Sequence, residues 1–266
     1  MTTELTDVTR ALPNRGDAIR VVPVATVDEI GVFTDAAAGP APAAQLTYRG
    51  GPLLTNVEVF TIFWGKGWKL PANKKLAGQI NGFFDVILGS ELIDQLGEYS
   101  RPGLKIGHGT HTGTATITTP NVGLSVSDGA IQHFLQQQLS SHPSMPQPSK
   151  NTLYFVYLPP GVSVTQGGGQ SCKVFCGYHS DINGTMFYAV MPYPGCVGCT
   201  GSLSAFDALT ATSSHELCEA ITDPVPGMGW YDDNFGEIGD ICAWKNKTVQ
   251  GYTVQVEWSN KKKSCA

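Results

Sequence analysis

Three apolar runs along the chain are too hydrophobic for half-exposed strands and predict strands buried on both faces. They are VEVFTIFWG at residues 57–65, NTLYFVYLPP at 151–160 and TMFYAVMPYP at 185–194. β-Branched and aromatic residues dominate these runs, which is typical of strands in the middle of a sheet. A further strand, with smaller residues, is expected within residues 106–119. The pattern therefore predicts a sheet at the centre of the fold.

Helical spacing of apolar residues appears between these runs. In residues 77–96 the apolar side chains recur at intervals of three and four, which predicts an amphipathic helix that Gly89 bends or divides. Residues 128–139 predict a second helix with Asp128 as its N-cap. The order strand, helix, strand, helix, strand, strand, helix predicts an α/β or α+β fold, with long helices packed on a mixed, twisted sheet.

The last helix in that order, residues 205–222, carries the most informative pattern. Within SSHELCEAITDP, His215 and Glu219 are four residues apart and therefore lie one turn apart on the same helix face. Glu216 projects about 100° around the axis from His215. Pro224 disfavours helical geometry at the residue before it, so the helix is expected to end near Thr222.

This helix resembles the H-E-x-x-H helix of zinc peptidases with a glutamate in the fifth position. The spacing predicts His215 and Glu219 as metal ligands and Glu216 as the general base. A third ligand could come from the acidic loop DPVPGMGWYDDNFGEIGD at 223–240, in which Glu237 and Asp240 lie between apolar residues. The alternative is an ordinary solvated His–Glu pair, which would stabilise the helix by only a few tenths of a kcal/mol.

Length and charge limit the classes of protein that fit. The chain has 266 residues, 41% of them hydrophobic, and can bury a sizeable core. Its formal charge of −5 and scattered basic residues exclude nucleic acid and anionic membranes as expected partners. No run approaches the ~20 apolar residues of a membrane span. Residues 1–45 lack periodicity and predict an arm or pro-segment outside the core, followed by a single domain at 46–266.

The seven cysteines all lie between residues 172 and 265. Six of them are expected to form disulfides, with Cys218 as the free thiol; a structural zinc site is the alternative for the first four. The six disulfide candidates are Cys172, Cys176, Cys196, Cys199, Cys242 and Cys265. Disulfides favour an extracellular or cell-envelope location, but no signal peptide is visible, which leaves the cytoplasm open.

Several motifs in a fixed order resemble the phosphate-induced, or exordium-like, protein family. They are YRGGPLLTNVEVFTIFWG, CKVFCGYHS, SHELCEAITDP, WYDD, GEIGDIC and VEWSNKKKSC, spread over residues 48–266. The resemblance implies an extracellular, disulfide-bearing protein that in plants is associated with growth signalling. The H-E-x-x-E residues, Glu237 and Asp240 match the family pattern, and so does His179, which becomes a further candidate ligand. Cys218 and a shorter loop after GEIGDIC depart from the plant pattern.

Two functions are consistent with these features. The first is a zinc-dependent hydrolase, most simply a peptidase acting on peptide or protein substrates on a zincin-like scaffold. Two carboxylates and one imidazole form a harder site than that of common zinc peptidases, so calcium and manganese are alternatives. The strand at 185–194 is expected at the sheet edge, where an extended substrate could pair with it. The second function is a non-enzymatic extracellular binding or signalling module. The sequence does not indicate an oligomeric state.

Overall fold

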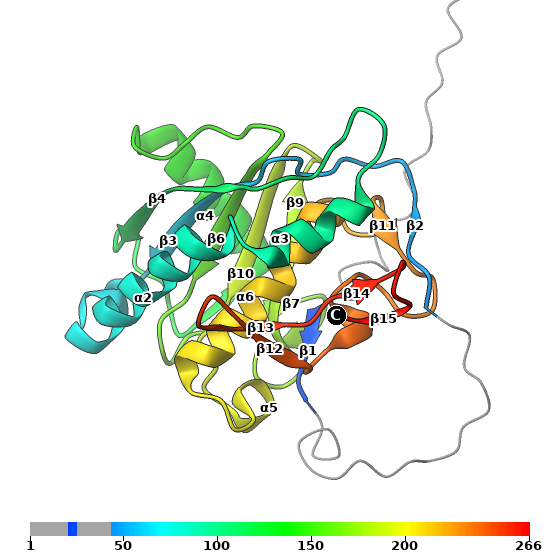
Figure 1. Ribbon diagram of the computed structural model, residues 1–266. Coiled ribbons are helices and arrows are strands. Elements are labelled where there is room, and N and C mark those ends of the chain that lie inside the picture. Colours follow the sequence, from blue (N-terminus) through cyan, green and yellow to red (C-terminus); the bar gives the residue numbers. More distant parts are fainter. Residues whose placement is uncertain (1–20, 26–43) are drawn as a thin grey trace, which may run out of the picture.

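A six-stranded mixed sheet forms the centre of the molecule (Figure 1). The computed structural model describes residues 21–25 and 44–266. The strand order is β1-β9-β10-β6-β3-β4; β10, β6, β3 and β4 are mutually parallel, and β9 is antiparallel to both β1 and β10. The strands are β1 (Val21–Pro23), β9 (Phe175–Ile182), β10 (Met186–Met191), β6 (Thr152–Tyr157), β3 (Glu58–Trp64) and β4 (Thr110–Ile117). The predicted α/β class is confirmed.

The three apolar runs form strands β3, β6 and β10, which are buried as predicted. Side chains on a strand alternate between the two faces of a sheet, and both faces are covered here. In β3, Val59 and Phe63 belong to one hydrophobic core, whereas Phe60 and Ile62 belong to the other. Burial on both faces explains why these runs do not alternate between apolar and polar residues.

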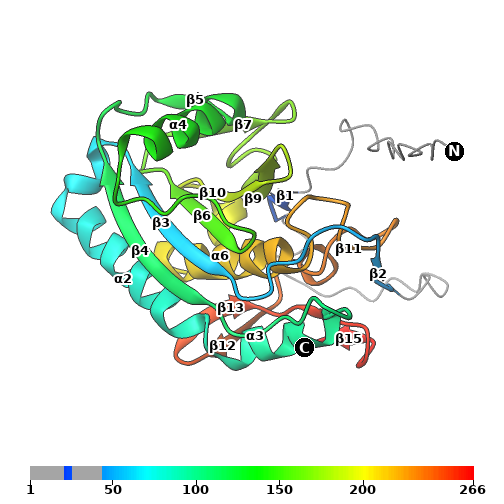
Figure 2. The same cartoon turned by 90° about the horizontal axis from the view of Figure 1, so that it is seen from above.

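Helices cover the sheet on both sides (Figure 2). On one side lie α2 (Pro71–Ile87), α3 (Glu91–Leu96) and α6 (Ala205–Thr222), and on the other lies α4 (Asp128–Ser141). The predicted division of the 77–96 helix is confirmed, since α2 ends before Gly89 and the Ser90 side chain caps α3 by accepting a hydrogen bond from the Leu92 amide. The predicted cap of α4 is wrong by one residue. Ser127 caps it, accepting from the Ala130 amide.

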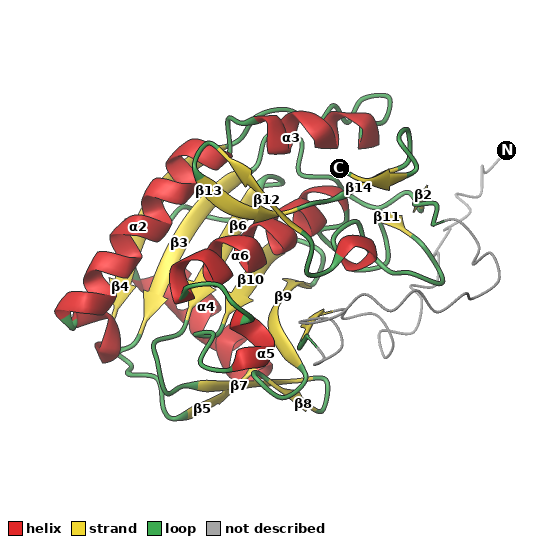
Figure 3. Ribbon diagram, turned by 60° about the horizontal axis from the view of Figure 1, so that its bottom comes forward, coloured by secondary structure: helices red, strands yellow, loops and turns green. Residues whose placement is uncertain are grey.

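Shorter elements complete the fold, and one of the C-terminal strands lies against α6 (Figure 3). They are η1 (Lys66–Lys69), η2 (Gly97–Tyr99), η3 (Asp240–Cys242), α5 (Val197–Thr200), β2 (Thr47–Tyr48), β5 (Ser125–Ser127), β7 (Ser163–Gln166), β8 (Gly169–Gln170), β11 (Trp230–Tyr231), β12 (Asn246–Val249), β13 (Tyr252–Gln255), β14 (Trp258–Ser259) and β15 (Ser264–Cys265). The β12–β13 hairpin covers the side of α6 that faces away from the sheet, so α6 is enclosed on all sides.

The expected edge strand at 185–194 is an inner strand instead. β10 lies between β6 and β9, and β9 is a strand that the sequence did not predict. The structure also differs from expectation at residues 21–25, because Val21–Pro23 pairs with β9 and extends the sheet. The rest of the predicted arm up to residue 43 lies outside the described residues. The edge of the sheet formed by β9 and β1 is therefore built from segments that have no strong strand pattern.

All six cysteines expected to form disulfides do so. The pairs are Cys172–Cys196, Cys176–Cys199 and Cys242–Cys265. Cys218 is a buried free thiol, as predicted. Paired sulfurs cannot also be thiolate ligands, so the alternative of a cysteine zinc site does not apply to this structure. Three disulfides in one domain are typical of proteins outside the cytoplasm. Within residues 21–25 and 44–266, every helix is too short or too polar to span a bilayer.

Candidate metal centre

Helix α6 positions the centre, and its ends follow from local sequence. Ser204 caps the start by accepting a hydrogen bond from the Asp207 amide, and the helix ends at Thr222, two residues before Pro224, as predicted. From Ala208 onward every residue of α6 is buried, including Thr, Ser, His and Glu side chains. A helix buried all round is unusual for a sequence with this many polar residues. Its polar side chains must therefore find partners inside the protein.

His215 and Glu219 lie together on one face of α6, as predicted. The His215 Nε2 atom is 2.9 Å from Glu219 Oε1, although the pair does not have hydrogen-bond geometry. The half-buried Asp240, at the start of η3, completes a group in which one ligand atom from each of the three residues lies within 4.8 Å of the others. The Asp240 amide also donates to Glu219 Oε1 at 3.2 Å. This trio has the composition of the predicted metal site.

A second trio shares Glu219 and includes the predicted base. His179, on β9, has Nδ1 3.1 Å from Glu216 Oε2 and 3.5 Å from Glu219 Oε2. These three residues also offer ligand atoms within 4.8 Å of one another. The second trio lies between β9 and α6, whereas the first lies between α6 and η3. Glu219 connects the two.

Two further acids border the trios. Glu237 Oε1 lies 3.5 Å from His179 Nε2, the ring nitrogen that also lies 3.1 Å from the Asp223 carbonyl oxygen. Glu257, between β13 and β14, is fully buried and interacts electrostatically with His215 and Glu219. The sequence analysis missed Glu257. Its signal was an acid within the apolar run Val256–Trp258, the same signal that pointed to Glu237.

The carboxylates outnumber the hydrogen-bond donors around them. Several buried side-chain atoms have no hydrogen-bond partner in the described part of the chain: Glu216 Oε1, Glu219 Oε2, both oxygens of Glu237, both oxygens of Glu257 and both ring nitrogens of His215. A buried polar atom without a partner costs about 1–3 kcal/mol, and more when charged. A divalent cation between these oxygens and nitrogens would satisfy several of them at once. The residues therefore fit a metal ion.

The pKa shifts of the metal-free protein reflect the same excess of buried carboxylates over hydrogen-bond donors. Burial raises the pKa of Glu237 and of Glu257 well above the ordinary range, and it raises that of Glu216 too. Burial opposes the charged imidazolium of His215, but the neighbouring Glu219 carboxylate outweighs it and raises the pKa of His215. Burial likewise acts against the Glu219 carboxylate, yet His215 and His179 lower its pKa to about 2. The protein thus holds protons here in the absence of metal.

Two glycines allow the elements to approach closely. A Cβ at Gly239 would lie 2.7 Å from His215 Nδ1, so a side chain there would displace the imidazole ring. A Cβ at Gly177, on β9, would lie 2.7 Å from Thr212 Cγ2 and 3.4 Å from Glu216 Oε1. The two distances of 2.7 Å are shorter than any normal contact, and the distance of 3.4 Å is at the limit of one. The glycines are therefore required for η3 and β9 to enclose α6.

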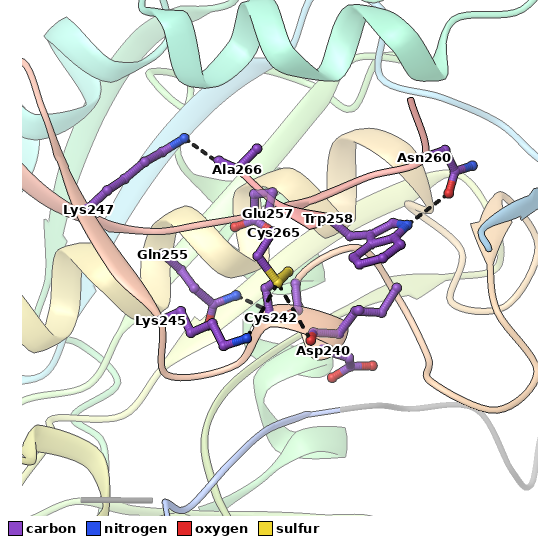
Figure 4. Close-up of a disulfide and its surroundings, with 12 residues drawn as sticks. Asp240, Cys242, Lys245, Lys247, Gln255, Glu257, Trp258, Asn260, Cys265 and Ala266 are labelled. Atoms are coloured by element: carbon purple, nitrogen blue, oxygen red, sulfur yellow. Dashed lines mark hydrogen bonds between the residues drawn. A yellow bond between two sulfur atoms is a disulfide. The ribbon is translucent and has the colours of Figure 1, made fainter. Parts of the chain in front are cut away.

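The Cys242–Cys265 disulfide fixes the segment that carries Asp240 (Figure 4). It joins the end of η3 to β15 near the C-terminus. The Gln255 side chain donates to the Gly239 carbonyl oxygen at 2.9 Å and holds the same turn from the other side. Asp240 is thus held by covalent and hydrogen-bonded restraints, which reduces the conformational entropy lost when a ligand binds.

All six side chains that the sequence singled out lie in this one region. They are His179, His215, Glu216, Glu219, Glu237 and Asp240. The first trio does not face open solvent, because His215 and Glu219 are only 0% and 1% exposed.

No protein-family model, curated protein or solved structure matches this chain. The site geometry is therefore the basis for the functional argument.

Proposed function

We propose that the protein is a metal-dependent hydrolase, with a zinc ion held by His215, Glu219 and Asp240. The observation that carries the proposal is the buried group of carboxylate and imidazole atoms without hydrogen-bond partners. Fully buried acids are rare unless paired with cations. The described residues offer two histidines at this place, and Glu219 is shared by both trios.

The roles of the side chains follow from their positions. A bound divalent ion would supply Lewis acidity, polarising a substrate carbonyl and making water more acidic. Glu216 has one oxygen hydrogen-bonded to His179 and one oxygen without a partner. Its free oxygen can accept a proton from an attacking water, while His179 orients the carboxylate. The Asp223 carbonyl oxygen, 3.1 Å from the other ring nitrogen of His179, fixes the orientation of that imidazole.

The donor set favours a hard ion more than the two-histidine sites of common zinc peptidases do. Carboxylates suit manganese and calcium as well as zinc, and imidazole favours zinc. We propose zinc as the native ion and expect manganese to substitute. Peptide or protein is the proposed substrate class, in line with the zincin-like helix motif.

A second candidate function is a non-enzymatic extracellular module in which a metal ion stabilises the fold. The near-complete burial of His215 and Glu219 favours it, because a structural site needs no open coordination position. This candidate agrees with the resemblance to exordium-like proteins, and the three disulfides support an extracellular location for either function.

Glu216→Gln separates the two candidates. The hydrolase proposal predicts that peptide hydrolysis by the zinc-loaded full chain falls about 10²–10⁴-fold in the variant, because a positioned base is lost. Metal content should stay unchanged, since Glu216 is not among the proposed ligands. Glu91→Gln on the exposed start of α3 is the matched control. No activity in either protein would favour the structural module, whereas equal hydrolysis by both would contradict the role of Glu216 as the base.

A further inference from the structure

Residues 21–25 lie against the edge of the sheet in the manner of a bound peptide. Val21 and Val22 pair antiparallel with Tyr178 and Gly177 of β9. Beyond the strand, the Val24 amide donates to the Val174 carbonyl oxygen at 2.9 Å, and the Ala25 amide donates to the Gly198 carbonyl oxygen at 2.9 Å. Main-chain hydrogen bonds to a strand edge are the usual basis of extended-peptide recognition.

The surface that receives this segment is built from rigid parts. Val22 is only 2% exposed and packs with Cys176 and Cys199, which form one disulfide. Val24 packs against the same small cluster, as do Cys172 and Cys196 of the second disulfide. These two disulfides join β9 and its preceding loop to α5. The surfaces that the Val22 and Val24 side chains contact, here called slots, are therefore held in place by covalent bonds within the main body of the protein.

Gly198 lies in close contact with the Val24 side chain in the second slot. A Cβ at Gly198 would lie 2.0 Å from Val24 Cγ1, so any side chain at that position would expel the valine. Val22 and Val24 occupy slots, and Pro23 between them is exposed. Alternate buried positions are the pattern of a peptide read by a sheet edge.

The segment is separable from the rest of the fold. Val22 and Val24 belong to a small cluster with the cysteines and Trp244, and neither valine joins the two large cores on the faces of the sheet. Its departure would leave both large cores intact. It would, however, uncover the backbone groups of β9, and an uncovered strand edge readily pairs with another extended chain.

We propose that the edge of β9, with the slots beside the two disulfides, is a peptide-binding groove that residues 21–25 occupy as an internal ligand. The groove takes an extended peptide with aliphatic, β-branched side chains at the two alternate positions filled by Val22 and Val24. In the full chain the internal segment competes with any external peptide for this groove, and the competition lowers the external peptide's apparent affinity.

The groove borders the candidate metal centre. Val22 pairs with Gly177, and a Cβ at Gly177 would be 3.4 Å from Glu216 Oε1. His179 lies two residues further along β9. If the proposed function holds, on which this paragraph alone rests, residues 21–25 occupy the strand edge beside the proposed base, where they would compete with a peptide substrate and inhibit hydrolysis.

The test uses a fluorescein-labelled synthetic peptide with the sequence of residues 19–27, followed by fluorescence anisotropy in EDTA, so that metal plays no part. Full-length Val22→Asp places a charge in the apolar slot and should vacate the groove. It is expected to bind the peptide at least ten-fold more tightly than wild type. Pro23→Asp makes the same charge change at the exposed position and should bind no more tightly than wild type. An unlabelled peptide with aspartate at the position of Val22 should not compete.

Equal peptide binding by Val22→Asp and Pro23→Asp would contradict the proposed peptide-binding groove, provided that thermal melting shows both variants to be folded. Val24→Asp, at the less buried slot, gives the same comparison should Val22→Asp fail to fold. A separate hydrolysis assay of the zinc-loaded variants isolates the proposed function. Tight peptide binding with faster hydrolysis in Val22→Asp supports both inferences, whereas tight binding without hydrolysis supports the groove and counts against the hydrolase.

Discussion

Two polar clusters lie on opposite faces of the same sheet, one built around the single acid Asp128 and the other around several carboxylates, and their acids are satisfied in different ways. On the α4 face, Asp128 accepts hydrogen bonds from Tyr178 at 2.7 Å, from Tyr188 at 2.8 Å and from Gln132 at 2.7 Å. On the α6 face, the carboxylates around His215 leave several buried oxygens without partners. The protein alone completes the first cluster, whereas the second keeps oxygens that the proposed cation would satisfy.

Two consecutive residues of β9 contribute to the two faces of the sheet. Tyr178 points into the core of the α4 face, and the next residue, His179, points to α6. Neighbouring residues of a strand project to opposite faces, so β9 contributes a donor to each cluster. The comparison shows that an enclosed acid is evidence for a ligand only when its donors have been counted, because the half-buried Asp128 finds all its donors within the protein. Asp128 serves as the internal reference for the α6 cluster.

Removal of metal should produce the largest difference between the two clusters. An ion present at a thousand times its Kd stabilises the folded state by ~4 kcal/mol. For a domain of this size each kcal/mol shifts Tm by ~2–4 °C, so EDTA should lower Tm by on the order of 10 °C. Asp128→Asn should show the same EDTA shift as wild type, because its cluster holds no ion. If the EDTA-induced shift in Tm disappeared in Asp128→Asn, the proposed difference between the Asp128 cluster and the α6 cluster would be contradicted.

Asp128→Asn itself should lower stability by a smaller amount. Its carboxylate accepts hydrogen bonds from two buried tyrosines, and hydrogen bonds to a charged group are each worth ~1.5–3 kcal/mol. An amide can keep part of the network, so we expect a loss of about 2 kcal/mol in urea unfolding. Glu58→Gln, on the rim of the sheet, is the matched control. A loss no larger than that of the control would show that the Asp128 network is not stabilising.

The pH dependence of the metal-free protein should give the smallest effect. Burial raises the pKa of Asp223 from 3.8 to about 6, so the folded state keeps a proton that the unfolded chain has released. The imidazoles of His179 and His215 also hold protons above their ordinary pKa of 6.5. Each of these shifts makes stability fall as pH rises.

The Tm in EDTA should therefore decrease by a few degrees between pH 5 and pH 7.5. Zinc competes with these protons, so the stabilisation by zinc should increase over the same range. Differential scanning calorimetry with and without zinc at both pH values measures both trends. A metal-free Tm that rises from pH 5 to pH 7.5 would contradict the account of the α6 cluster.

The sequence predicted those parts of the fold that depend on local patterns. Continuous apolar runs identified β3, β6 and β10, and the proline at 224 located the end of α6. The i,i+4 spacing placed His215 and Glu219 on one face. These features depend on short-range geometry, which the sequence displays directly.

The remaining elements could not be predicted because they depend on pairing between segments far apart in the chain. β9 escaped prediction because its interior holds His179 and Ser180 among apolar residues, which obscures any period of two. β1 is three residues long and exists through its pairing with β9, more than 150 positions away in the chain. The complete burial of α6 depends on the β12–β13 hairpin. None of these contacts leaves a periodic signal.

Elemental analysis of the purified full chain, after incubation with zinc and removal of excess ion, decides whether these residues form a metal centre. We expect about one ion per chain in wild type and in His133→Ala, which removes an exposed imidazole from α4. In His215→Ala, which removes a ligand, bound zinc should be lost. Wild-type protein without stoichiometric zinc, or His215→Ala that retains it in full, would contradict the claim that these residues form a metal centre.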